Sequence, residues 1–425
     1  MILLPLTIFL LLITTRSQSS FNGDTLATDP QLEFENPRLR NAYIALQAFK
    51  EAILSDPNNV TATWAGPDPC SYTGVFCWPS PDNPCERTVA GLDLNHANLA
   101  GHLPHELGLL FDLAVFHLNS NRFCGKLPQS LASLGVLHEL DLSNNRFAGP
   151  FPTFLLDIKN LKYLDLRYNE FEGALPEALF SKNLDAVFVN DNRFSSALPD
   201  NIGNSLASVL VLANNDFEGC LPPGLGDMWA TLNELVVTNN GLSSCFPSEI
   251  GRLRNLTVLD VSRNRIVGPL PDSIGDMSSL VELNVGHNLM SGGIPSGICQ
   301  LPSLVNFLYE DNYFTSHGPE CLSLPGFDDG MNCLRGRPGQ RPGEDCRRFL
   351  AKAVNCSSFG CGAATSPQPP PPPPSPVNPP LPTPNVGPSP QPPVGQPTPG
   401  MGPSPTPPEK CMPPCCQCAR SPSGV

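Results

Sequence analysis

The sequence predicts an α/β solenoid, a coil in which each short turn packs on the turn before it. Two observations predict this fold class. The string Leu140-Asp-Leu-Ser-Asn-Asn145 returns as Leu164-Asp-Leu-Arg-Tyr-Asn169 and as Leu259-Asp-Val-Ser-Arg-Asn264. Its last asparagine recurs in steps of 23 to 25 residues, at positions 121, 145, 169, 192, 215, 240, 264, 288 and 312. This is the period of leucine-rich repeats, and one further copy beginning at Leu92 gives about ten turns.

Each turn can be justified from its own residues. The L-x-L unit predicts a short strand whose leucines point into the core, and the asparagine is expected to hydrogen-bond the backbone at the bend that follows. The G-x-L-P ending closes the turn and resembles the plant extracellular class of these repeats. One turn cannot bury its apolar side alone, so each is stabilised by its neighbours. We assign the repeats to residues 89–315.

The N-terminus has the pattern of an export signal. An apolar run from Ile2 to Ile13 is followed by small polar residues, which predicts a signal peptide over residues 1–19. No later stretch is apolar and long enough to span a membrane. Twelve of the 16 cysteines lie between Cys70 and Cys361, and an exported chain forms disulfides. We therefore expect a secreted, extracellular protein.

Residues 20–88 and 316–365 are expected to cap the two ends of the array. Apolar residues at helical spacing predict a helix over residues 39–54, followed by Trp64 and the pair Cys70 and Cys77. This arrangement resembles the N-terminal cap of plant receptors and inhibitors. The second segment is a cysteine-rich C-terminal cap or hinge.

The spacing of the cysteines suggests several disulfides. Cys220 and Cys245 each follow a repeat asparagine by five residues, on strands about 4.8 Å apart, within the α-carbon separation that a disulfide needs. We predict Cys220–Cys245, and Cys70–Cys77 within the cap. We also consider Cys85–Cys124 and Cys299–Cys321.

The distribution of charge limits the classes of partner. Of 39 acids and 25 bases, one acid and two bases fall in residues 366–425, which leaves 38 acids and 23 bases before them, a net charge of −15. Such a surface disfavours nucleic acid and anionic lipid and favours cationic ligands.

The exposed strand positions should form the inner face of the arc. Acids gather toward both ends of this face, and an apolar strip of Phe188, Val209, Val211 and Val236 lies in its middle. An exposed apolar patch edged by charge is typical of a protein contact, although any repeat surface carries some apolar residues. We expect a basic polypeptide to bind there, at Glu139, Asp141, Tyr163, Asp165, Phe188, Val211, Glu234, Val236, Asp260 and Glu282.

Catalysis and metal binding have little support in the sequence. The seven histidines are scattered, and no serine or cysteine nucleophile can be placed beside His117 by register. The cluster from Cys411 to Cys418 contains no histidine and favours disulfides over zinc. We predict no enzyme, no cofactor and no metal. Glycosylation acceptor motifs start at Asn59, Asn255 and Asn355.

Residues 366–425 differ from everything before them. They hold 25 of the 51 prolines and cannot form a core, so we expect an extended polyproline II segment that reaches roughly 190 Å. The simplest interpretation of this segment is an extended spacer. Hydroxylation is expected in its unbroken proline run and just beyond it, at Pro369, Pro370, Pro371, Pro372, Pro373, Pro374 and Pro376.

Several strings exceed the general repeat consensus and resemble the plant leucine-rich repeat extensins. They include Phe116-His-Leu-Asn-Ser-Asn-Arg-Phe-Cys124, Asn239-Asn-Gly-Leu-Ser-Ser-Cys245 and Asn355-Cys-Ser-Ser-Phe-Gly-Cys361. The resemblance implies a secreted cell-wall protein that shapes wall assembly and polarised growth. It also implies that the repeats bind rapid alkalinization factors, which are cationic, cysteine-containing peptide hormones, and that a hydroxyproline-rich tail anchors the protein among wall polysaccharides such as pectin.

The tail departs from the family pattern and leaves alternatives open. Family tails repeat serine followed by several prolines and often carry tyrosines for cross-linking, whereas no tyrosine follows Tyr313 here. Retention in the wall could then be ionic or glycan-based, or use the terminal cysteines. The alternative function is a soluble inhibitor of wall-degrading enzymes that resembles polygalacturonase-inhibiting proteins. The sequence leaves a homodimer open as well.

Overall fold

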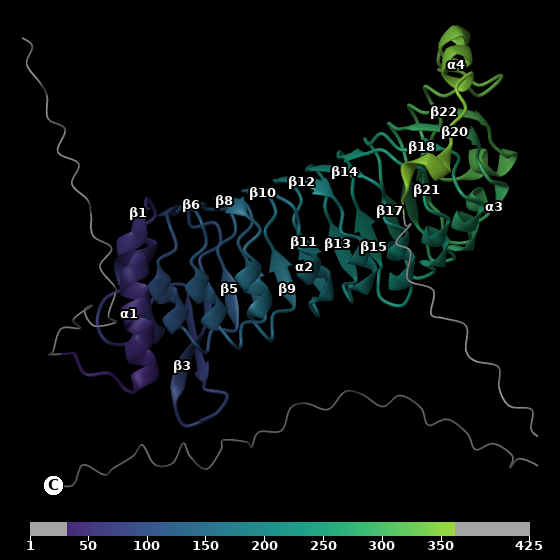
Figure 1. The fold of residues 1–425 in the computed structure, drawn as a ribbon. Coiled ribbons are helices and arrows are strands. Elements are labelled where there is room, and N and C mark those ends of the chain that lie inside the picture. Colours follow the sequence, from purple (N-terminus) through teal and green to yellow (C-terminus); the bar gives the residue numbers. More distant parts are fainter. Residues whose placement is uncertain (1–31, 362–425) are drawn as a thin grey trace, which may run out of the picture.

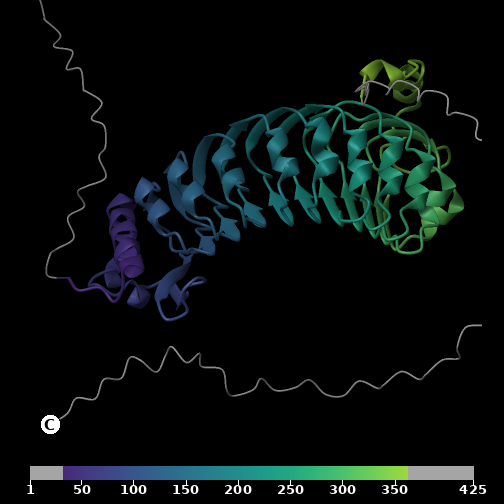
Figure 2. The same cartoon turned by 60° about the horizontal axis from the view of Figure 1, so that its bottom comes forward.

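The computed structural model describes residues 32–361, which wind into a curved arc of stacked turns. Figure 2 shows the strand arrows along the hollow side of the arc and short helical turns along its outer side. The predicted leucine-rich repeat solenoid is thereby confirmed. The predicted signal peptide (1–19) and the Pro-rich tail (366–425), with its hydroxyproline candidates, lie outside the described residues.

One long sheet forms the inner face (Figure 1). Its neighbours are parallel except for the first pair, and its twelve strands follow chain order. They are β2 (Val75–Pro79), β3 (Arg87–Asp93), β5 (Val115–His117), β7 (Glu139–Asp141), β9 (Tyr163–Asp165), β11 (Ala186–Phe188), β13 (Val209–Val211), β15 (Glu234–Val236), β17 (Val258–Asp260), β19 (Glu282–Asn284), β21 (Asn306–Leu308) and β23 (Gly326–Asp328).

A second set of strands follows the bends of the turns and forms two further sheets. The eight-stranded one contains β1 (Ile53–Ser55), β4 (Ala100–Gly101), β6 (Arg122–Gly125), β8 (Arg146–Pro150), β10 (Glu170–Gly173), β12 (Arg193–Ala197), β14 (Asp216–Gly219) and β16 (Gly241–Leu242). The three-stranded one contains β18 (Val267–Gly268), β20 (Leu289–Gly293) and β22 (Tyr313–Ser316).

Helical turns occupy the outer side and the two ends. The α-helices are α1 (Pro37–Ala52), α2 (Glu177–Ser181), α3 (Ser296–Cys299) and α4 (Gly343–Leu350). The 3₁₀ turns are η1 (Val60–Thr63), η2 (Pro69–Ser71), η3 (His105–Leu109), η4 (Gln129–Ser133), η5 (Thr153–Asp157), η6 (Asp200–Asn204), η7 (Pro223–Met228), η8 (Ser248–Arg252), η9 (Asp272–Asp276), η10 (Pro319–Ser323) and η11 (Cys356–Phe359).

The N-terminal cap covers the first turn with α1, as the apolar spacing predicted. The Asn36 side chain accepts a hydrogen bond from the Leu39 N–H at 2.9 Å and caps the helix. Leu46 and Phe49 on the covered side of α1 are fully buried, and the ring of Phe49 lies 5.5 Å from that of Phe123 in the second turn. Phe49 thus extends the aromatic core of the array into the cap.

The repeat asparagines bridge neighbouring turns as expected. Asn145 accepts a hydrogen bond from the Phe123 N–H at 3.0 Å and donates to the carbonyls of Leu118 at 2.8 Å and Leu142 at 3.1 Å. The residue before it, Asn144, takes a left-handed φ of 53° that makes the bend. Each asparagine therefore satisfies buried backbone groups that no strand partner reaches.

The array continues one strand beyond the turns that the pattern showed. Strand β23 pairs with β21, and Asn332 accepts a hydrogen bond from the Phe314 N–H at 3.0 Å in the same manner as the other repeat asparagines. The sequence pattern did not show this turn, because Asn332 follows Asn312 by fewer residues than the repeat period.

The disulfides correct one predicted pairing. Cys220 and Cys245 are both bridged, but not to each other: their partners are Cys361 and Cys356. The Cys220–Cys245 prediction was wrong because α-carbon proximity permits a bridge without excluding a partner far along the chain. The Cys85–Cys124 pairing was also wrong, since Cys124 is a free, exposed thiol.

Two other pairings were predicted correctly, and one was missed. The bridges Cys70–Cys77 and Cys299–Cys321 are present. The bridge Cys333–Cys346, which ties α4 to the end of the array, was not foreseen. After α4 the chain returns along the side of the arc, where the bridges from Cys356 and Cys361 hold it on the seventh and sixth repeats; we call residues 351–361 the strap.

Candidate functional site

The middle of the inner face carries the apolar strip that the sequence predicted. In the sheet register, Phe188 pairs with Val211 and Val211 with Val236, so these side chains lie on three adjacent strands of one face. All three are half-buried. Tyr163 adds a second ring at this strip, with its centroid 5.5 Å from that of Phe188. The strip is thus continuous from β9 to β15.

The acids that end several of the inner-face strands have a structural role that the sequence reasoning overlooked. Asp141 and Asp260 each accept a hydrogen bond from the backbone N–H two residues ahead, in Ser143 and Ser262, at 2.9 Å. Asn284 accepts one from the Gly286 N–H in the same way at 3.1 Å. A short side-chain acceptor at this position holds the bend after the strand. One carboxylate oxygen of each acid is therefore used to stabilise the bend, and a ligand would contact the other oxygen.

Asp165 is the clearest departure from the expected exposed position. Its side chain is 0% exposed, and its carboxylate accepts a hydrogen bond from the Tyr163 hydroxyl at 3.3 Å and contacts the Arg167 guanidinium at 3.0 Å. Burial, followed by repulsion from Asp141, raises the pKa of Asp165 to about 6. Asp165 is thus a supporting group beneath the face and does not offer its carboxylate to a ligand.

Arg167 is a site residue that sequence reasoning missed. Its guanidinium lies 5.1 Å from the centre of the Phe188 ring and is held by Asp165 below. The apolar strip therefore has one cation fixed at its edge. The residue directly after the L-x-L unit differs among the turns, so no repeat pattern marked Arg167.

The ends of the face offer acids of different availability. Glu139 lies 3.3 Å from the His117 ring. Glu234 and Glu282 are half-buried, and within residues 32–361 their side-chain carboxylates have no hydrogen-bonding or ion-pairing partner. These two carboxylates are the ones that the face offers to a cation without first breaking a contact.

A second charged group lies at the C-terminal end and was also missed. The His287 ring contacts the Asp311 carboxylate at 2.9 Å and the Glu310 carboxylate at 3.5 Å, and Arg341 pairs with Asp311 from the far side. Burial raises the pKa of Glu310. The group links the last turns to the C-terminal cap.

The remaining site predictions concern modification and metals. Asn59, Asn255 and Asn355, the three glycosylation acceptors, are exposed, so a glycan is sterically allowed at each. Within residues 32–361, no group of three or more histidine, cysteine or acidic side chains has a geometry that could hold a metal ion. No helix of that range is long and apolar enough to cross a membrane.

Family models match the repeats and the cap separately. A leucine-rich repeat N-terminal domain model matches residues 43–78. Leucine-rich repeat models match residues 136–157, 160–181 and 230–305. The first match begins within α1 and includes the Cys70–Cys77 bridge, and the others lie within the stacked turns.

Curated plant proteins are similar over most of the chain. The leucine-rich repeat extensin-like protein 7 of Arabidopsis thaliana is 64% identical over 343 residues, which cover 81% of this chain and 79% of that protein. The leucine-rich repeat extensin-like protein 4 of the same plant is 57% identical, over 83% of this chain and 71% of that protein. The extensin-like protein 5 is 66% identical, but the alignment covers only 42% of its length. The chain thus spans less than half of its longest matched relatives.

Solved structures share the arc. The receptor kinase ectodomain GASSHO1/SCHENGEN3 of Arabidopsis thaliana, in complex with CASPARIAN STRIP INTEGRITY FACTOR 2, superposes with a TM-score of 0.59 at 21% identity, over 70% of this chain and 41% of that one. A plant ice-binding protein superposes with a TM-score of 0.59 at 24% identity, over 71% of this chain and 97% of that one. A TDR receptor superposes with a TM-score of 0.51 at 29% identity, over 57% of this chain and 47% of that one. At these identities the first two structures show the fold alone.

Proposed function

Because this chain belongs to the leucine-rich repeat extensin-like family, we propose that it is a secreted cell-wall protein that captures a cationic peptide on the inner face of its arc. The peptide class is that of the rapid alkalinization factors, which the family resemblance implies. Through this capture the protein shapes wall assembly and polarised growth. It acts by binding, without catalysis.

The apolar strip between acids is the observation that carries this proposal. Phe188, Val211 and Val236 supply a contact that excludes water, and the open carboxylates of Glu234 and Glu282 supply charge next to it. A cationic peptide with one apolar side chain would place that side chain on the strip and its basic residues on the acids. Such a core with a polar rim is the usual anatomy of a protein contact.

The tail supports the second half of the proposal, retention in the wall. Cys361 is bridged to Cys220, so the Pro-rich segment joins the arc at the side of its sixth repeat. A ligand on the inner face and a matrix contact through residues 366–425 would then use different parts of the chain. We propose that hydroxylated prolines of this segment, including Pro369–Pro374 and Pro376, hold the protein among wall polysaccharides such as pectin.

A calorimetric titration tests the capture step. The full secreted chain is titrated with a cationic, cysteine-containing peptide of the rapid alkalinization factor class, at low salt and at about 0.5 M salt. Tight binding that weakens with salt is expected, since exposed charge pairs are screened within a few ångströms at that ionic strength. Failure of every such peptide to bind at low salt would refute the proposal.

A further inference from the structure

A groove lies at the N-terminal end of the arc, beside the inner face and away from the apolar strip. Its cavity has a volume of about 570 Å³. One wall is the β2 strand and the loop after it, with Trp78, Pro79 and Pro81. The Trp78 side chain is 71% exposed, which is unusual for so large an apolar group.

The floor of the groove is built from two parallel rows of side chains. Ala114 N–H bonds to the Ala90 carbonyl at 2.8 Å, His138 N–H to the Ala114 carbonyl at 2.8 Å, and Lys162 N–H to the His138 carbonyl at 2.9 Å. These four residues therefore occupy one position on four successive turns. A second row two residues earlier contributes Thr88, Asp112, Val136, Asn160 and Asn183. The groove runs across the turns, so it suits a linear ligand.

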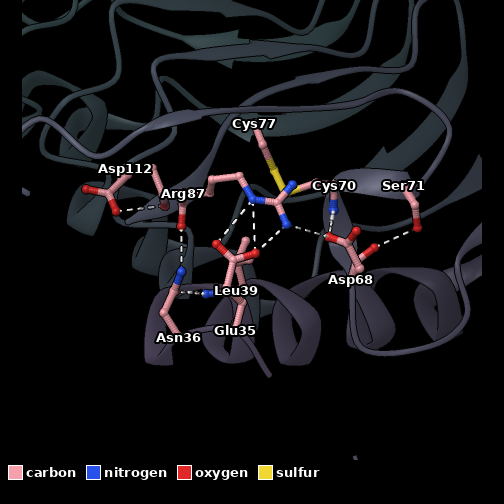
Figure 3. The surroundings of a disulfide bond; sticks show 10 residues. Glu35, Asn36, Leu39, Asp68, Cys70, Ser71, Cys77, Arg87 and Asp112 are labelled. Atoms are coloured by element: carbon pink, nitrogen blue, oxygen red, sulfur yellow. Dashed lines mark hydrogen bonds and ion pairs between the residues drawn. A yellow bond between two sulfur atoms is a disulfide. The ribbon is translucent and has the colours of Figure 1, made fainter. Parts of the chain in front are cut away.

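The tryptophan wall is held in place before any ligand arrives. The Cys70–Cys77 bridge fixes β2 next to Trp78, and Arg87 pairs with Glu35 and Asp68 beside it (Figure 3). These contacts restrain the strand that carries the exposed indole. A preformed wall costs little ordering free energy when a ligand binds.

A single arginine ties the loop of this wall to the floor. Arg38 on α1 contacts Asp82 at 2.7 Å, Glu86 at 3.2 Å and the floor residue Asp112 at 2.6 Å. The Thr88 hydroxyl donates a further hydrogen bond to Asp112 at 2.8 Å. Asp112 is thereby paired within the protein and adds little negative charge to the groove.

The far end of the groove is basic in a chain that is otherwise acidic. Lys159 and Lys162 line it, and three of the six lysines of residues 32–361 lie between residues 159 and 182. Lys162 contacts the exposed Asp185 at 3.3 Å, and no acid contacts Lys159 within the described residues. Two ammonium groups next to the amides of Asn160 and Asn183 present donors to a carboxylate.

We propose that this groove binds a linear oligosaccharide that carries carboxylates, with one sugar ring on Trp78 and uronate carboxylates on Lys159 and Lys162. An indole face packs against the C–H face of a pyranose ring. The turns repeat every ~4.8 Å, comparable with one pyranose unit, whereas side chains on one face of an extended peptide recur every ~6.6 Å. The spacing thus favours a glycan over an acidic peptide. This inference uses a different surface from peptide capture and does not depend on it.

Tryptophan fluorescence tests the proposal on the full chain, because it has three tryptophans and Trp64 is fully buried. The probe is a homogalacturonan oligosaccharide in EDTA, so that no divalent ion bridges carboxylates. The Trp229→Phe variant, which removes the other exposed tryptophan, should keep the ligand-induced change, and Trp78→Phe should abolish it. The reverse result would overturn the proposal.

The charge requirement has its own matched control. Lys159→Gln with Lys162→Gln should weaken binding at least about tenfold, while Lys126→Gln with Lys352→Gln, the same charge change at exposed lysines elsewhere, should leave it unchanged. Equal weakening by both pairs would overturn the site and indicate diffuse attraction. Tighter binding of poly-glutamate than of the oligosaccharide would overturn the glycan assignment. Peptide capture should be unaffected by the Trp78 variant, so the two proposals fail separately.

Discussion

Asp165 and Arg167 form an ion pair at 3.0 Å in which the carboxylate is fully buried and the guanidinium lies against the Phe188 ring. A buried carboxylate with one partner is costly, because its second oxygen atom lacks water. Here the backbone N–H of Arg167 donates to one oxygen atom of the Asp165 carboxylate, and the Tyr163 hydroxyl donates to the other. The pair therefore fixes the position of the cation at the edge of the apolar strip and links the shape of the inner face to the protonation of one group.

The first prediction concerns the pH dependence of stability through Asp165. Its pKa is about 6 in the folded chain and near 3.8 when unfolded, so between these values the folded state binds more protons. The contribution of this group to the free energy of unfolding therefore falls as pH rises from about 4 to 6, by about 2 kcal/mol. Denaturant unfolding of the wild type and Asp165→Asn at pH 4, 5, 6 and 7 measures it.

The control for that experiment is Asp260→Asn. Asp260 has the same hydrogen bond to the backbone two residues ahead, but its side chain is only half-buried. The stability difference between wild type and Asp165→Asn should change by about 2 kcal/mol across this range. Asp260→Asn tests whether loss of the same backbone hydrogen bond at a less buried position is enough to produce that change. A flat difference for both variants would contradict the buried, protonatable state of Asp165.

The second prediction separates apolar and ionic contributions to peptide capture. Phe188→Ala should weaken binding of a cationic peptide by at least about tenfold, since an aromatic ring at the centre of a contact carries much of its energy. Glu234→Gln with Glu282→Gln should weaken it about 2- to 10-fold at low salt, and less at high salt. Titration calorimetry at two salt concentrations measures both effects.

Variants on the outer side of the arc provide the matched comparison. Glu177→Gln in α2 and Asp276→Asn in η9 remove the same charge from exposed positions of helical turns. They should leave affinity within about twofold at 0.15 M salt, where distant charges are screened. If this pair weakened binding as much as the Glu234 and Glu282 pair, the ligand would not be docked on the inner face.

The third prediction addresses the bridging asparagines. Asn145→Ala removes an acceptor for the Phe123 N–H and donors for buried carbonyls, so it should cost about 2–4 kcal/mol. Asn160→Ala removes one exposed hydrogen bond to the Gly135 carbonyl and should cost less than about 1 kcal/mol. Thermal unfolding at fixed pH compares the two. An equal loss of stability in the two variants would mean that the buried hydrogen bonds of Asn145 stabilise the fold no more than the exposed one of Asn160.

The fold was predictable because its information is local and repeated. An L-x-L unit and one asparagine specify both the strand and the bend, and each turn needs only its neighbours. The turn ending at Asn332 was missed for the same reason, since its shorter spacing breaks the period. The cap helix was predictable from apolar spacing and is capped by Asn36, a residue type suited to that position.

The candidate site was less predictable, because the repeat register shows which face a side chain points to but not how far its neighbours bury it. The pattern correctly placed Phe188, Val211 and Val236 on one face. It could not show that Tyr163 and Arg167 would cover Asp165, since that depends on the size and contacts of neighbouring side chains. The groove at Trp78 was likewise hidden, because its two walls lie far apart in the sequence and only the turns bring them together.

The last prediction concerns the strap. Chymotryptic cleavage at Trp229 and Phe359 separates the four cysteines that hold residues 351–361 to the arc. Non-reducing peptide mapping should then yield peptides that link Cys220 with Cys361 and Cys245 with Cys356. A peptide linking Cys220 with Cys245 would contradict the structure.

Removing one bridge tests what the strap contributes. The double variant Cys245→Ser with Cys356→Ser creates no new unpaired thiol and removes a bridge between residues 111 apart, so the free energy of unfolding should fall by about 2–4 kcal/mol. Residues 351–360 are exposed and pack little against the turns, so the folded array itself should persist. Hydrogen exchange should therefore rise in the strap while the Asn145 and Asn264 turns stay protected. Loss of protection throughout the array would show instead that the strap is required to hold the turns together.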